Sequence, residues 1–112
     1  MTKKEDAMIF SSLNQRATLQ VHTLLPDGGG GYSESWQSLA AVWVKITALA
    51  PTERFAAERL EPKARHRILL RRRSDLAIGQ RVIVGARTFH VHGIEDDGPR
   101  APFVTLFCEE LP

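Results

Sequence analysis

Strict alternation of apolar and polar side chains is the feature of this sequence that most restricts its fold. From Asn14 onward, Ala17, Leu19 and Val21 take alternate positions, and polar side chains fill the positions between them. This two-residue period is typical of a β-strand with one buried face. Further short strands are indicated at residues 41–47, 65–73, 81–84, 87–94 and 103–108. Five or six strands at this spacing predict a small antiparallel β-barrel.

One short helix is expected between the second and third strands. Pro51 suits the first turn of a helix, Glu53 complements the helix dipole, and a helix-forming run follows as far as Leu60. Pro62 would end this helix. Turns are expected at residues 74–75, 85–86 and 95–99. The fold class is therefore mainly β with one short helix.

A glycine run separates the first two strands. Four consecutive glycines have too much backbone entropy for the interior of a strand or helix, so residues 26–35 are expected to form a long flexible loop. The run lacks the glycine spacing of phosphate-binding loops. We consider it a candidate flexible assembly loop, formed by Gly28, Gly29, Gly30 and Gly31.

The length of the chain limits its organisation. A chain of 112 residues is enough for one domain and too short for two independent cores. Residues 1–12 are polar without a period and predict a flexible N-terminal arm, which leaves residues 13–112 as a single barrel domain. A single cysteine excludes an internal disulfide framework and a multi-cysteine zinc site. No apolar run reaches the ~18 residues of a membrane span, so we expect a soluble intracellular protein without a membrane partner.

The residue types needed for catalysis do not form a recognisable site. Cys108 lies in an apolar strand and precedes two glutamates, which oppose thiolate formation. His90 and His92 share a strand face without a third metal ligand at a recognisable spacing. The carboxylates of residues 95–97 fall in an expected exposed turn. We therefore predict that the protein is not an enzyme and has no catalytic, cofactor-binding or metal-binding residues.

Charge is segregated along the chain although the net charge is only +2. Residues 63–87 contain eight basic side chains and a single acid, Asp75. Candidate contacts to DNA or to a neighbouring subunit are Arg65, Arg67, Arg71, Arg72 and Arg73, and candidate acidic inter-subunit partners are Glu95, Asp96, Asp97, Glu109 and Glu110. The basic face could bind phosphates, could contact a neighbouring subunit, or could be a solvated outer face.

An ordered set of short motifs resembles the head-tail joining proteins of long-tailed bacteriophages, also known as head-closure or stopper proteins. The set begins with residues 13–20, a glycine-rich loop and Trp36-Gln37, and continues with residues 42–46, 53–57, 66–71, 80–84 and 87–94. Together these motifs span roughly residues 13–111, nearly the whole chain. Each motif is weak alone, but the ordered set is fairly specific.

This resemblance implies a β-barrel with a helix and a long loop, assembled as a ring of six or twelve copies. The ring would lie at the neck of a virion or phage-like particle, after synthesis in the bacterial cytoplasm. Its implied partners are the portal or adaptor ring, the tail-terminator protein and the double-stranded DNA that passes through the channel. Phages, prophages and gene transfer agents all carry such proteins. The ring would close the head and provide the surface to which the tail docks.

A second function remains open from the residues alone. An oligonucleotide-binding β-barrel would use the arginine-rich strand as its phosphate-binding face. Trp36 and Trp43 could then serve as stacking platforms for bases.

Overall fold

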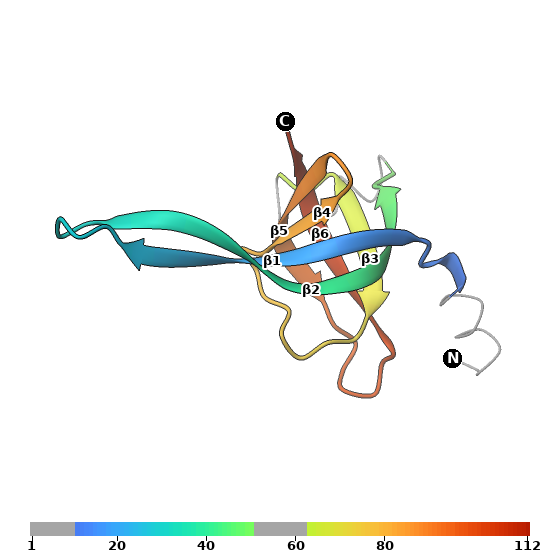
Figure 1. The fold of residues 1–112 in the computed structure, drawn as a ribbon. Coiled ribbons are helices and arrows are strands. Elements are labelled where there is room, and N and C mark those ends of the chain that lie inside the picture. Colours follow the sequence, from blue (N-terminus) through green and yellow to red (C-terminus); the bar gives the residue numbers. More distant parts are fainter. Residues whose placement is uncertain (1–10, 51–62) are drawn as a thin grey trace.

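The computed structural model describes residues 11–50 and 63–112, which form a closed antiparallel β-barrel (Figure 1). The order of the strands around the barrel is β1-β2-β3-β6-β5-β4. The strands are β1 (Gln15–Pro26), β2 (Tyr32–Ala48), β3 (His66–Arg71), β4 (Arg81–Val84), β5 (Arg87–Glu95) and β6 (Phe103–Leu111). The predicted barrel is thereby confirmed.

The interior of the barrel is filled by the apolar side of each alternating strand. On β1, Ala17 and Leu19 point inward, and on β6 the inward residues are Val104, Leu106 and Cys108. The core also contains Val42, Val44, Ile68, Leu70, Val82, Phe89 and Val91. Because small barrels have no room for a lumen, these side chains pack against one another across the axis. The two-residue period thus predicts the core correctly.

Two of the predicted turns lie where the sequence places them. Gly85 and Ala86 join β4 to β5 as a two-residue hairpin turn, and Gly85 has a φ of +57°. Ser74 and Asp75 also form a turn. The positive φ explains the glycine at position 85, because a side chain there would be strained.

The predicted helix at residues 51–60 lies outside the described residues, as do residues 1–10 of the predicted N-terminal arm. Within residues 11–50 and 63–112, no helix has both the length and the apolar character needed to cross a membrane.

The connection between β1 and β2 differs from the prediction. Residues 26–35 were expected to form a long loop, but β1 continues to Pro26 and β2 begins at Tyr32. The two strands pair along this whole stretch, from Val21 opposite Gln37 to Pro26 opposite Tyr32. They extend well beyond the barrel as a two-stranded ribbon (Figure 1). We name residues 21–37 the protruding hairpin.

A β-bulge marks the root of the protruding hairpin. Leu19 pairs with Ala40, whereas the next residue, Gln20, pairs with Ser38, so Leu39 has no partner on β1. The neighbouring strands stop near this point, since β4 pairs with β1 only from Thr18 to Gln20. From there outward no other strand of residues 11–50 and 63–112 pairs with the ribbon. The chain spans 56 × 29 × 28 Å along its principal axes.

Candidate assembly surface

The tip of the protruding hairpin is a tight turn with defined hydrogen bonds. The Asp27 carboxylate accepts hydrogen bonds from the backbone N–H groups of Gly29 (2.8 Å) and Gly31 (3.1 Å). Gly28 and Gly30 have φ values of +84° and +87°, which favour glycine over any residue with a side chain. The glycine run is therefore used to close a hairpin, and its role in assembly stays a prediction.

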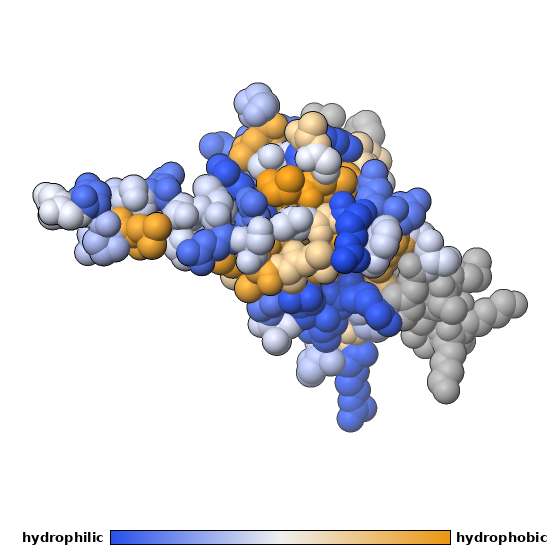
Figure 2. All heavy atoms as spheres, viewed as in Figure 1, coloured by the Kyte–Doolittle hydropathy of each residue, from blue (hydrophilic) through white to orange (hydrophobic). Residues whose placement is uncertain are grey.

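The protruding hairpin has no core. None of its residues is buried, and three large apolar side chains near the tip are strongly exposed: Leu24 (57%), Leu25 (45%) and Tyr32 (68%). Figure 2 shows hydrophobic side chains on the surface of this hairpin near its tip. An isolated two-stranded ribbon is at best marginally stable in water. Exposed apolar side chains on such a ribbon are typical of a contact surface.

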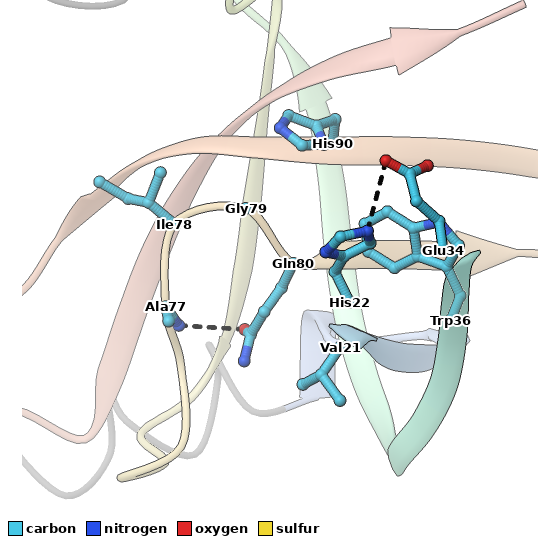
Figure 3. Close-up of a pocket in the computed structure, with 9 residues that line it drawn as sticks. All are labelled: Val21, His22, Glu34, Trp36, Ala77, Ile78, Gly79, Gln80 and His90. Atoms are coloured by element: carbon cyan, nitrogen blue, oxygen red, sulfur yellow. Dashed lines mark hydrogen bonds and ion pairs between the residues drawn. The ribbon is translucent and has the colours of Figure 1, made fainter. Parts of the chain in front are cut away.

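A concave pocket of about 550 Å³ lies where the protruding hairpin meets the barrel (Figure 3). One wall is the hairpin, where the centres of the His22 and Trp36 rings lie 5.0 Å apart. The other walls are His90 and the loop before β4, whose shape is held by the Gln80 amide through hydrogen bonds to Ala77 and Asp75. The remaining lining residues are Val21, Glu34, Ile78 and Gly79.

Contacts of Trp36 connect the root of the hairpin to the barrel. The Arg81 guanidinium lies over the Trp36 ring, 3.9 Å from its centre. Arg81 itself is fixed by strand pairing with Gln20 on one side and His90 on the other. A cation–π contact of this kind is worth about 0.5–2 kcal/mol. It holds the ribbon at its exit from the barrel.

Basic side chains gather on the outer surface of β1, β2 and β3. Strand pairing places Arg16 opposite Trp43, and its guanidinium lies 5.2 Å from the centre of that ring. Trp43 is 51% exposed. The basic face consists of the outward-pointing cations of these strands, which are Arg16, Lys45, Arg67 and Arg71.

A cleft of about 260 Å³ opens beside the exposed Trp43 on the basic face. Its lining residues are Ala41, Val42, Trp43, Arg71, Arg72 and Arg73. The cleft therefore combines an aromatic surface with guanidinium groups at one edge. This composition suits a ligand that presents apolar groups together with carboxylates or phosphates.

The predicted arginines lie in three different settings in the structure. Arg72 forms a two-point ion pair with Asp96, and Arg73 forms one with Asp75. These contacts raise the pKa of both arginines and lower the pKa of Asp96 to about 2. Arg67 and Arg71 belong to the basic face, and Arg65 donates a hydrogen bond to the carbonyl of Ala64.

Most of the predicted acidic partners contact cations or histidines of the same chain. Glu110 accepts two hydrogen bonds from Arg87 and Glu109 contacts His92 at 2.9 Å, and each contact lowers the pKa of its carboxylate. Glu95 and Asp97 are exposed and make no ion pair with the described residues. The inter-subunit role of these five acids stays a prediction.

The remaining candidate groups for chemistry are Cys108 and the pair His90 and His92. Cys108 is fully buried, and burial raises the pKa of its thiol to about 12. The centres of the His90 and His92 rings lie 4.7 Å apart. Burial lowers the pKa of His90, and the neighbouring His92 and Arg81 lower it further. Among residues 11–50 and 63–112 no three histidine, cysteine or acidic side chains could together hold a metal ion.

Sequence reasoning singled out Trp36 but did not predict that the outer half of β2, from Tyr32 onward, is a strand. Residues 33, 35 and 37 are polar and alternate with Tyr32, Glu34 and Trp36, so one side of this ribbon is polar and the other mixed. The two aromatic residues favour a strand. The glycine run before them favours a loop. These residues show no alternation of apolar and polar side chains that would indicate a strand instead.

A small closed barrel with a protruding hairpin that exposes large apolar side chains has a surface suited to contact with other protein chains. Comparison with known families makes this specific. The profile described as "phage head completion protein" matches residues 8–111, and the chain belongs to that family. It is thus a structural protein of phage-like particles, in agreement with the resemblance seen in the sequence.

Two solved structures share the fold. A Shigella flexneri 2a protein known from a solution structure matches with a TM-score of 0.74 at 21% identity, over 88% of this chain and 93% of that chain. A chain from the virion of a native gene transfer agent particle matches with a TM-score of 0.60 at 26% identity, over 88% of this chain and 94% of that chain. No curated protein sequence matches significantly.

Proposed function

We propose that this protein forms a ring between the portal or adaptor of a DNA-filled capsid and the tail. The ring closes the head, surrounds the DNA channel and provides the surface to which the tail docks. Membership of the head completion family and similarity to a gene transfer agent virion chain support this role. The copy number, six or twelve, follows from how neighbouring subunits meet.

The observation that carries the proposal is the protruding hairpin. A segment of 17 residues, 21–37, has no buried side chain and presents Leu24, Leu25 and Tyr32 to solvent. The barrel core contains no residue of this segment. The segment therefore adds little to the stability of an isolated barrel, and its retention needs another reason. In a ring, the hairpin lies against a neighbouring subunit, a neighbouring ring or the channel, where its apolar side chains are removed from water.

Deleting the gene tests this proposal. Particles from the deletion strain are expected to be DNA-filled heads without attached tails, and a plasmid copy of the gene is expected to restore tailed particles. Cryo-electron microscopy of complemented particles is expected to show the barrel as a ring at the neck. Normally tailed particles from the deletion strain would contradict the proposal.

A second candidate function rests on the exposed Trp43 beside Arg16. An aromatic ring flanked by cations is the arrangement with which oligonucleotide-binding barrels stack bases and contact phosphates. This function predicts binding of single-stranded oligonucleotides at low salt that weakens steeply as salt is raised. Anisotropy titrations without binding at 20 mM salt would exclude it.

A further inference from the structure

The tip of the protruding hairpin and the basic face have opposite chemical character. No lysine or arginine occurs between Arg16 and Lys45, so the only formal charges on the hairpin are those of Asp27 and Glu34. The Glu34 side chain is 76% exposed, and its Oε1 lies 3.6 Å from Nε2 of His22 on the same ribbon. Asp27 lies at the tip and Glu34 lies farther back, opposite Leu24, so the outer part of the hairpin combines two carboxylates with the exposed apolar side chains of Leu24, Leu25 and Tyr32.

The cleft beside Trp43 is complementary to such a tip. Trp43 and Ala41 provide its exposed apolar wall, and Arg71 stands at its edge. The outward positions of β1, β2 and β3 around it carry no carboxylate; they are Arg16, Thr18, Gln20, Ala41, Trp43, Lys45, Thr47, Arg67, Leu69 and Arg71. Asp96 and Asp75 lie close to the cleft, where they pair with Arg72 and Arg73. The charged side chains at the outward strand positions themselves are all cations.

A tip cannot reach the cleft of its own subunit. The cleft lies at the root of the protruding hairpin, and the six residues from Val21 to Pro26 carry the tip about 20 Å away along an extended ribbon. Figure 1 shows the ribbon leading away from the barrel. A second copy can bring its cleft to the tip, because the ribbon holds the tip clear of its own barrel.

We propose that the hairpin tip of each copy docks in the Trp43 cleft of the next copy. The apolar tip side chains lie against Trp43, and the carboxylates of Asp27 and Glu34 face Arg16 and Arg71. Tip and cleft are different surfaces, so the contact is heterologous and repeats around a closed ring. This inference rests on the proposed function, because it names the contact that joins the subunits of the proposed ring.

Cysteine cross-linking tests the contact directly. One copy carries Tyr32→Cys and a second, distinguishable by size, carries Ala41→Cys; the native Cys108 is buried and does not interfere. Mixed in purified protein or co-expressed in assembling particles, the two variants are expected to form a disulfide-linked heterodimer under mild oxidation. The matched control is Ala86→Cys, an exposed alanine on the β4–β5 turn, for which at least tenfold less product is expected.

Charge reversal supplies a second readout. Glu34→Lys and Arg16→Glu are each expected to lower ring formation at least tenfold, and the double variant is expected to recover most of it. Arg100→Glu, an exposed arginine on the β5–β6 loop, is the control and should assemble like the wild type. Duplex DNA binding is measured on the same variants.

The outcomes separate this inference from the proposed function. Rings without the Tyr32–Ala41 cross-link, or without recovery in the double variant, would overturn the docking contact and leave the ring intact. Loss of DNA binding in Arg16→Glu, with normal assembly of Glu34→Lys, would assign the basic face to DNA instead. Absence of any ring at the neck would overturn both.

Discussion

The barrel and the protruding hairpin are built from the same two strands under opposite constraints. Within the barrel, β1 and β2 bury Leu19 and Val44 completely, whereas beyond the bulge the same strands bury nothing. The barrel can therefore be understood from its own core. The hairpin keeps its pairing but buries no side chain fully, so its free energy is expected to depend on what it contacts in an assembly.

The largest effect should come from truncating the centre of the barrel. Phe89 is fully buried with its ring against His66, and Phe89→Ala is expected to lower the free energy of unfolding by about 3–5 kcal/mol. This is a large share of the ~5–15 kcal/mol that stabilises a typical domain. Urea unfolding followed by circular dichroism measures it.

Tyr32→Ala is the matched control on the hairpin. The side chain is 68% exposed, so its removal should change the free energy of unfolding by no more than about 0.5 kcal/mol. Equal losses in the two variants would mean that the hairpin and the barrel fold as one cooperative core.

Removing the hairpin should affect assembly far more than stability. Val21 and Gln37 face each other across the ribbon, so residues 22–36 can be replaced by Asn-Gly, a two-residue hairpin turn. The shortened chain is expected to keep its melting temperature within a few degrees, because its core is intact. In particles it should fail to complement the gene deletion. A shortened chain that restores tailed particles would show that the hairpin is dispensable.

The smallest effect concerns an ion pair on the barrel rim and appears only in acid. Hydrogen bonds from Arg72, and from the N–H of Gly98, lower the pKa of Asp96 from 3.8 to about 2. The carboxylate is thus more acidic in the folded state, and the stability it contributes is present above pH 4 and is lost as the pH falls toward 2. Asp96→Asn should show a weaker dependence of the urea midpoint on pH in this interval.

The control for this titration is the neighbouring Asp97→Asn, because Asp97 is exposed and makes no ion pair with the described residues. Its urea midpoint should follow that of the wild type at each pH. If Asp96→Asn also follows the wild type, the contact with Arg72 does not contribute to folding.

Burial explains which parts of the structure the sequence could predict. Alternation at Ala17 and Leu19, and again at Val104 and Leu106, predicts strands and their inward faces because one side of each strand must leave water. The protruding hairpin has no such side. The ion pair between Arg72 and Asp96 could not be predicted from the sequence either. These residues are 24 positions apart, and the conformation of a loop brings them together.

The bulge at Leu39 gives one strand two different phases. In the barrel, even-numbered residues of β2 such as Val42 and Val44 point to the axis, yet beyond Leu39 the even-numbered Trp36 shares the outer side of the ribbon with His22. If the pairing were continuous and Leu39 lay opposite Gln20, Trp36 would fall opposite Thr23, on the other side of the ribbon and away from Arg81. The bulge thus separates the alternation pattern of the barrel from that of the hairpin. Substitutions that suit the barrel core and substitutions that suit the surface of the hairpin therefore do not constrain each other.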